Sequence, residues 1–144
     1  MAAGERVQGE CLCGAVTMAA TLKDGSMHAC HCSMCRRWSA GPFLYLAVEP
    51  ASLQIAGGEA VGRYRSSAEA ERGFCRICGS TMFWRALDGS SLDISAQSVD
   101  DPARFPFATE VFMDDKPGNY AFADATRKFS GDEGSARTAE ARNG

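Results

Sequence analysis

The chain has 144 residues, with 15 lysines and arginines against 18 aspartates and glutamates, so its formal net charge is −3. With 45% hydrophobic residues, this composition predicts one folded, mildly acidic domain and argues against a disordered protein or a basic nucleic-acid binder. The first ten residues contain no apolar core of a signal peptide, and no window approaches the ~20 apolar residues of a membrane span. We therefore expect a cytoplasmic protein, whose clustered cysteines would be reduced and serve as metal ligands or catalytic thiols.

Short strand-like segments follow one another along the chain, and long helical periodicity is absent. Residues 16–22 alternate as in a strand with one buried face, and residues 43–48 form a continuous apolar run typical of a strand covered on both faces. Further strands are expected at residues 53–55, 61–65, 73–75, 81–85 and 110–113. Asp88-Gly89 predicts a two-residue type I′ hairpin turn after residues 81–85. The sequence thus predicts a mainly β fold with few short helical turns.

Helical signals are local. Asp101-Pro102 favours a short turn, and residues 32–38 are expected to coil briefly beside a metal. We expect a single domain over residues 8–129, after a flexible N-terminus of residues 1–7. Residues 130–144 lose their large apolar side chains and are predicted to be a disordered tail.

Seven cysteines dominate the chemistry of the sequence, and an odd number excludes a complete set of intramolecular disulfides. Thiols two or three residues apart can converge on one ion, as tetrahedral zinc requires. Two such pairs far apart in the sequence make one closed structural site, and a glycine after each pair supports a tight turn. The four ligands of this predicted site are Cys11, Cys13, Cys75 and Cys78.

The other three cysteines, Cys30, Cys32 and Cys35, predict a second metal site. Three protein ligands with an open fourth position form the arrangement of a catalytic zinc, to which a thiol, water or carbonyl oxygen can bind. Alternatively, a histidine completes a second structural site. His28 has the better parity for this role, because it shares a strand face with Cys30, whereas His31 would point away.

Two further interpretations of the cysteines stay open. Cys75 and Cys78 have the spacing of a redox dithiol, although the sequence lacks the βαβ context in which such motifs begin a helix. All seven cysteines could instead be reduced thiols of the core. Three close pairs in one small chain argue against this last interpretation.

Three segments, GECLCGAVT, CHCSMCRRWSAGPF and FCRICGSTMFW, resemble in this order the glutathione-dependent formaldehyde-activating family, which includes the centromere-protein-V-like proteins. The resemblance extends over residues 8–122. It implies a β-tent fold of packed antiparallel sheets, with a structural zinc and a labile or catalytic zinc. The ligands it implies are the same two sets that spacing indicates.

The resemblance also implies an activity, the addition of the glutathione thiol to formaldehyde by a carbon–sulfur lyase acting in the synthetic direction. Arg36 and Arg37 directly follow the last cysteine of the second set, and guanidinium groups suit the carboxylates of glutathione. Their alternative role is that of solvated surface residues. Trp38 and Phe43 are candidates for pocket walls or for core residues. Lys116 lies in a segment similar to the family's lysine-proline stretch and is a further candidate for binding substrate.

At two places the chain departs from the family pattern. Glu110 stands where members often have a histidine, and Asn119-Tyr120 follows the lysine-proline pair where members often have a tryptophan. The leading hypothesis is a zinc-dependent carbon–sulfur lyase acting on glutathione or a related thiol and a small aldehyde, and the departures bear on its specificity for glutathione. The alternative is a non-catalytic zinc-binding β-tent protein for partner binding or metal handling. A nucleic acid is not an expected partner, because the chain is mildly acidic and has no basic extension. A membrane is not expected either, because no apolar window approaches the length of a span.

Overall fold

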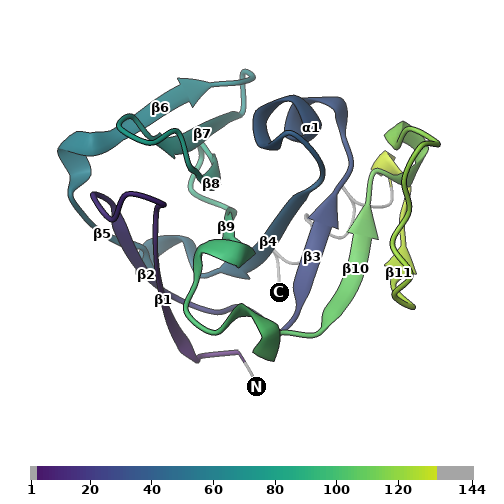
Figure 1. Cartoon of the computed structure of the whole chain (residues 1–144), viewed down its shortest axis with the longest axis horizontal. Helices are drawn as coiled ribbons and strands as arrows, with labels where there is room; N and C mark the ends of the chain where they lie inside the picture. The colour runs from purple at the N-terminus through teal and green to yellow at the C-terminus, as the bar shows by residue number, and fades with distance from the viewer. Residues whose placement is uncertain (1–2, 133–144) are drawn as a thin grey trace.

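Two β-sheets make up most of the computed structural model, which describes residues 3–132 (Figure 1). Within these residues the smaller sheet has three strands in the order β1-β2-β5, namely β1 (Arg6–Glu10), β2 (Thr17–Thr21) and β5 (Gln54–Ala56). The larger sheet has eight strands in the order β11-β10-β3-β4-β9-β8-β7-β6. Their bounds are β3 (Met27–Cys30), β4 (Phe43–Val48), β6 (Val61–Arg65), β7 (Ala70–Cys75), β8 (Thr81–Ala86), β9 (Leu92–Ser95), β10 (Phe107–Val111) and β11 (Arg127–Lys128).

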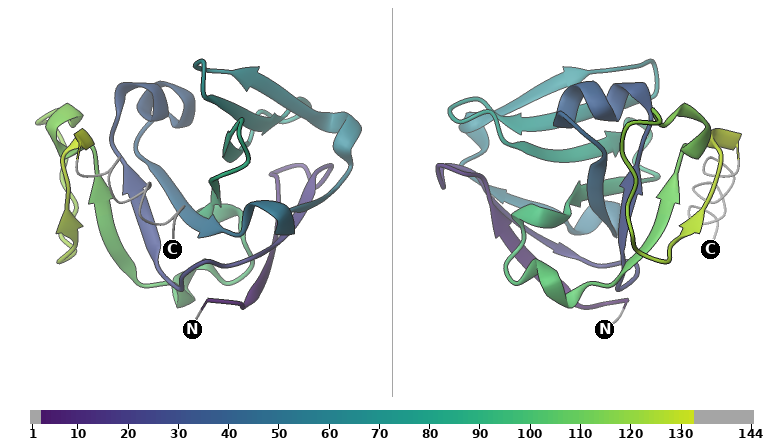
Figure 2. Two further views of the ribbon diagram at one scale, coloured as in Figure 1. Left: turned by 180° about the vertical axis from the view of Figure 1, so that it is seen from behind. Right: turned by 45° about the vertical axis from the view of Figure 1, so that its right-hand side comes forward.

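The strands pair mostly with their sequence neighbours. Strand β10 is parallel to both β3 and β11, and the other strand pairs within residues 3–132 are antiparallel. One α-helix, α1 (Ser33–Ser39), lies between the β3–β10 end and the β6–β8 end of the large sheet in the described chain (Figure 2). Five short 3₁₀ helices complete that part of the chain: η1 (Pro50–Ser52), η2 (Gly58–Ala60), η3 (Ala96–Ser98), η4 (Pro102–Arg104) and η5 (Met113–Asp115). The mainly β, packed-sheet class is confirmed, with parallel pairs as an addition to the expected pattern.

The core lies between the two sheets. Val16, Met18, Ala20 and Leu22 are each at most 3% exposed, so the predicted alternation at residues 16–22 is confirmed. They pack in one cluster with apolar side chains of β4, β8 and β9, including Leu46. Burial of each large side chain in such a cluster contributes about 1.5–3 kcal/mol, and this holds the two sheets together.

Two local predictions are corrected by backbone conformation. The β8–β9 hairpin is present, but its turn is not type I′, because Gly89 has a φ of 78° while Asp88 does not have a positive φ. The Gly89 N–H instead donates to Ala86 O at 3.0 Å, which makes residues 86–89 the turn. The strand expected at residues 110–113 is Phe107–Val111, because Phe112 takes a left-handed φ of 58° and ends it.

Ordered structure begins before Gln8, the predicted start of the domain. Strand β1 starts at Arg6, and the Val7 side chain is buried in the core. At the other end, the Gly131 N–H donates to Asp114 Oδ1 at 2.7 Å, and residues 133–144 of the predicted tail lie outside the described residues. Within residues 3–132 no helix has the length and apolar character needed to cross a membrane.

Candidate functional site

The first candidate metal centre is the four-cysteine cluster of Cys11, Cys13, Cys75 and Cys78. Its four sulfur atoms all lie within 4.8 Å of one another. The Cys11–Cys13 and Cys13–Cys75 sulfur distances are 3.7 and 3.8 Å. Sulfurs at ~2.3 Å from a central zinc form a tetrahedron with edges of about 3.8 Å. The donor set therefore fits a four-coordinate metal ion, as the spacing predicted.

Both cysteine pairs of this cluster sit in similar turns. Cys11 follows β1 and Cys75 ends β7, and the N–H groups of Gly14 and Gly79 donate to the carbonyls of these two cysteines. Gly14 and Gly79 each have a φ of 80°, a conformation that glycine adopts without strain. The turns also aim N–H groups at sulfur, since the Val16 N–H lies 3.3 Å from Cys11 Sγ. Such donors stabilise thiolates, which are the metal-binding form.

The second candidate centre is the three-cysteine cluster of Cys30, Cys32 and Cys35, whose sulfurs also lie within 4.8 Å of one another. Cys30 ends β3, and Cys32 is the N-cap of α1, where its Sγ accepts the Cys35 N–H at 3.3 Å. Hydrogen bonds with the Cys30 and Cys35 thiols lower the pKa of Cys32 to about 2. The pKa of Cys30 is correspondingly raised by its hydrogen bonds to Cys32 and Cys35 and by burial. The cluster is thus built to hold at least one thiolate.

Neither histidine belongs to this cluster as the structure places it. His28 Nε2 lies 3.2 Å from both carboxylate oxygens of Asp24, and no ring nitrogen of His28 joins the three sulfurs, so its role as a fourth ligand stays a prediction without a contact to support it. His31 points away from the sulfurs, as parity suggested, and lies 2.7 Å from Glu110 Oε1 and 2.7 Å from the Tyr120 hydroxyl. Among residues 3–132, no histidine or carboxylate joins the three sulfurs.

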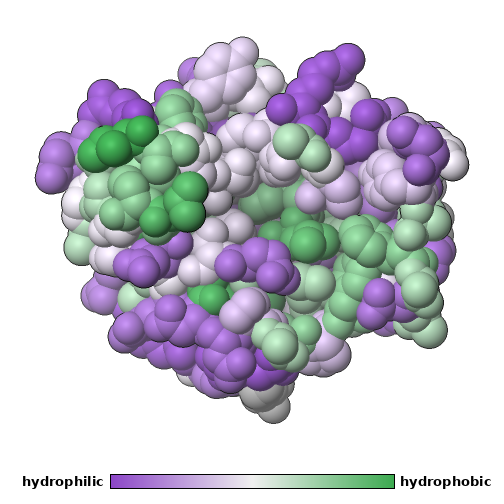
Figure 3. Space-filling view, viewed as in Figure 1, coloured by the Kyte–Doolittle hydropathy of each residue, from purple (hydrophilic) through white to green (hydrophobic). Residues whose placement is uncertain are grey.

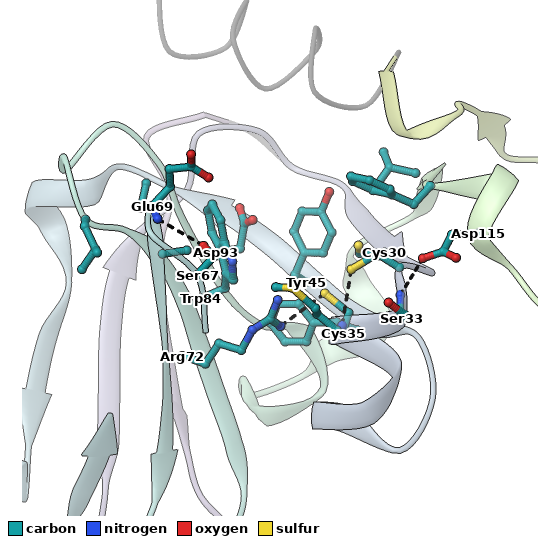
Figure 4. Close-up of a pocket in the computed structure, with 18 of the residues that line it drawn as sticks. Cys30, Ser33, Cys35, Tyr45, Ser67, Glu69, Arg72, Trp84, Asp93 and Asp115 are labelled. Atoms are coloured by element: carbon teal, nitrogen blue, oxygen red, sulfur yellow. Dashed lines mark hydrogen bonds between the residues drawn. The ribbon is translucent and has the colours of Figure 1, made fainter. Parts of the chain in front are cut away.

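A cleft of about 1060 Å³ opens on the three-cysteine cluster. Its walls come from four adjacent strands of the large sheet, β4, β9, β8 and β7, from the loop at residues 67–69 and from the end of β10. Figure 3 shows the hollow on the face seen in Figure 1, with hydrophobic side chains inside it. In Figure 4, Tyr45 lies between the cysteines and a group that contains Trp84 and Asp93. A cleft of this volume suits a small-molecule ligand.

Arg72 is the cation of this cleft, and sequence analysis missed it. Its side chain is 3% exposed, and Nη1 lies 3.4 Å from Cys35 Sγ. The Nε atom donates to Ser66 Oγ at 3.0 Å, and the guanidinium lies 4.9 Å from the ring centre of Trp38. A buried guanidinium is costly without a negative partner, and Cys35 Sγ would be that partner as a metal-bound thiolate. The sequence signal that could have indicated Arg72 is its position on a strand, three residues before the predicted ligand Cys75.

The four predicted substrate-binding residues do not line the cleft. Arg36 Nε donates to the carbonyl of His31 at 2.9 Å, and Arg37 is exposed on α1. Trp38 packs on Phe43 with ring centres 5.0 Å apart, and Phe43 is the member of this pair that reaches the cleft. Lys116 Nζ lies 4.5 Å from the ring centre of Tyr120. Their roles in binding substrate stay a prediction.

Together these observations define a mainly β protein with two cysteine clusters able to hold metal, one of which opens on a cleft. The family model described as glutathione-dependent formaldehyde-activating enzyme matches residues 6–115, and the chain belongs to this family. The resemblance seen in the sequence is thereby confirmed.

Two individual proteins are similar to the chain. An uncharacterized lyase of Schizosaccharomyces pombe is 35% identical over 127 residues, which cover 88% of this chain and 92% of that protein. A crystal structure of a Rhodobacter sphaeroides protein has the same fold, with a TM-score of 0.58 and 19% identity, covering 85% of this chain and 99% of the other. The family and this relative place the chain among lyase-type proteins.

Proposed function

We propose that the protein is a carbon–sulfur lyase-type enzyme that adds a thiol, such as glutathione, to formaldehyde or another small aldehyde. In this reaction the thiol sulfur forms a bond to the carbonyl carbon and the C=O π bond breaks. The thiol proton ends on the oxygen, so the product is an S-hydroxyalkyl thiol and no oxidant or reductant is needed. Family membership and the lyase relative support the reaction class.

The observation that carries the proposal is the cleft at the three-cysteine cluster. Three sulfurs converge there without a fourth protein ligand among the described residues, and the fourth side faces a cavity of about 1060 Å³. A structural metal site has its ligand set closed by protein, as in the four-cysteine cluster, whereas a catalytic site keeps one position accessible. This contrast within one chain favours an enzyme over the non-catalytic alternative.

We propose zinc for both clusters, structural at the four cysteines and labile at Cys30, Cys32 and Cys35. When bound at the three-cysteine cluster, zinc would supply a site that lowers the pKa of an incoming thiol. Arg72 offsets the excess negative charge of three thiolates, and its contact with Cys35 fixes the orientation of that sulfur. The aromatic walls of the cleft, including Trp84, limit the water around the reactants. Because formaldehyde is strongly electrophilic, holding two reactants together provides most of the catalysis.

NMR exchange spectroscopy of glutathione with formaldehyde tests this proposal, in the presence and absence of the zinc-loaded protein. We expect faster exchange into the hemithioacetal with the protein, and no acceleration with Cys32→Ser. Thermal unfolding of Cys32→Ser checks that the variant is folded. If neither glutathione nor simpler thiols exchange faster with the wild-type protein, the proposed function is wrong.

A further inference from the structure

The charged side chains that line the cleft are mostly acidic. Among the described residues the lining contains the carboxylates of Glu69, Asp88, Asp93 and Asp115 but a single cation, Arg72. Arg72 is already engaged, since it donates to Ser66 and to Cys35. The other cations considered for substrate, Arg36, Arg37 and Lys116, lie outside the lining. Two of the carboxylates are engaged as well, since Asp115 accepts the Ser33 N–H and lies 4.0 Å from Arg36 Nη2, and Asp88 accepts hydrogen bonds from Ser90. Carboxylates still outnumber cations in the lining, so an anionic ligand would meet more like charge than opposite charge.

The strand register places one of these carboxylates beside an aromatic side chain of the cleft wall. Asp93 of β9 lies opposite Trp84 of β8 and opposite Ala47 of β4. Opposite residues of antiparallel strands project from the same face, and so does Tyr45, two residues before Ala47. Figure 4 shows Asp93 and Trp84 on the far side of Tyr45 from the cysteines. One end of the cleft thus holds sulfur and the other a carboxylate with aromatic faces.

This second end has the chemistry of a cation site. Aromatic faces attract ammonium and guanidinium groups through the ring quadrupole, and a nearby carboxylate adds Coulombic attraction. Glutathione has two carboxylates and one ammonium group, so it presents a net negative charge to this surface. The two departures from the family pattern, Glu110 and Asn119-Tyr120, likewise add no positive charge.

We propose that the thiol substrate of this chain carries a positive charge at the end remote from its sulfur, and that Asp93 and Trp84 bind this charge. The sulfur then faces the three-cysteine cluster, and the acidic side chains at the cleft mouth attract the substrate. The proposal rests on the proposed thiol addition and specifies the class of thiol. It makes Asp93 a specificity-determining residue.

Three small thiols of different charge test the proposal, each with formaldehyde and the zinc-loaded protein. They are thiocholine, which is permanently cationic and has no amine to condense with formaldehyde, neutral 2-mercaptoethanol and anionic 3-mercaptopropionate. Each exchange rate is divided by the uncatalysed rate of the same thiol at the same pH, which removes differences in intrinsic reactivity. We expect the acceleration for thiocholine to exceed that for 3-mercaptopropionate about tenfold, or about 1.4 kcal/mol.

Asp93→Asn keeps the size of the side chain and removes its charge. We expect this variant to reduce several-fold the ratio of the acceleration of thiocholine to that of 3-mercaptopropionate. Glu59→Gln removes one negative charge at an exposed position outside the cleft and is the matched control, with the preference retained. In the wild-type protein, raising ionic strength should reduce the preference, because salt screens charges. The salt dependence of the wild-type protein tests the inference if Asp93→Asn does not fold.

The outcomes separate the two proposals. If the protein accelerates 3-mercaptopropionate as much as thiocholine or more, thiol addition stands and the inference is overturned. Carboxylate binding by Arg36 or Arg37 would then be favoured. A folded Asp93→Asn protein that keeps the full preference for thiocholine also overturns it, and so does a wild-type preference that salt does not change. Absence of acceleration for all three thiols and glutathione overturns the proposed function itself.

Discussion

His31 Nε2 lies 2.7 Å from Glu110 Oε1, and both side chains are at most 1% exposed. The other ring nitrogen, Nδ1, lies 2.7 Å from the Tyr120 hydroxyl, and Glu110 Oε2 accepts a hydrogen bond from Thr126. His31 stands between the predicted ligands Cys30 and Cys32. The network therefore joins this part of the three-cysteine cluster to β10, through Glu110, and to the chain after β10, through Tyr120 and Thr126. It fixes the backbone that carries Cys30 and Cys32.

Glu110→Ala should destabilise the protein by about 3 kcal/mol, because it leaves the buried His31 without its anionic partner. Burial raises the pKa of Glu110, but hydrogen bonds from Thr126 and His31 outweigh it and the pKa is lowered, so the carboxylate is ionised at neutral pH. Urea unfolding measures the loss. Glu110→Gln, which keeps a hydrogen-bonding side chain, should lose less, and exposed Glu59→Ala is the control. Equal stability of Glu110→Ala and Glu59→Ala would contradict the structural role of the network.

Glu71 links three strands of the large sheet, and its contribution to stability should depend on pH. Its Oε1 lies 3.2 Å from Arg63 Nη1 of β6 and 3.1 Å from Arg85 Nε of β8. Burial raises the pKa of Glu71, but the hydrogen bond and charge of Arg85 outweigh it, so the pKa is lowered. A lowered pKa in the folded state stabilises the protein above the unfolded-state value of about 4.3, and this contribution disappears as pH falls through the lowered pKa.

Unfolding experiments on wild type and Glu71→Gln from pH 7 to pH 2.5 measure this effect. The difference in unfolding free energy should be about 0.5–1 kcal/mol at neutral pH, since both arginines are partly exposed and screened. It should decline below about pH 4. A difference that is constant down to pH 2.5 would refute the assignment.

Loss of one ligand should have different consequences at the two cysteine clusters. Cys78→Ser removes a ligand of the closed set that joins the end of β1 to β7, so we expect one zinc fewer per chain and a strongly lowered thermal unfolding temperature. Cys32→Ser should also lose one zinc while the unfolding temperature changes little, and a mild chelator should remove this same zinc first from the wild type. Elemental analysis and thermal unfolding provide both readouts. A normally stable Cys78→Ser protein with full zinc content would rule out the four-cysteine assignment.

Gly9 of β1 lies directly against the backbone of the last residue of η3 and of Val99, with which it forms a β-bridge. A Cβ atom there would lie 2.4 Å from Ser98 O and 2.8 Å from Val99 Cα, both of which belong to the backbone. Gly9→Ala should therefore cost about 1–3 kcal/mol of unfolding free energy, as overpacking does. Gly118→Ala, where the added Cβ meets nothing within 4 Å, should leave stability unchanged or slightly raised. Similar unfolding midpoints in urea for the two variants would disprove this account.

The pattern of apolar and polar residues predicted many of the strands, because backbone geometry alone decides which side chains of a strand share a face. The alternation at residues 16–22 predicted which side chains face the core, since a strand turns alternate residues to opposite faces. Turn geometry was less accessible: the position of Gly89 in its hairpin depends on how β8 and β9 pair, and Phe112 ends β10 in a conformation rarely adopted by a bulky residue.

The sequence by itself determined which cysteines form close pairs, because sulfurs two or three residues apart can converge on one ion. Only the tertiary structure brings Cys11 and Cys13 beside Cys75 and Cys78. It also decided what surrounds the three-cysteine cluster. Strand order places Arg72, Trp84 and Asp93 on adjacent strands of one wall, far in sequence from Cys30. Tertiary packing also turned Arg36 toward the His31 carbonyl and brought Glu110 to the His31 ring. Contacts of this kind depend on which strands become neighbours, and residue spacing along one chain carries no record of that choice.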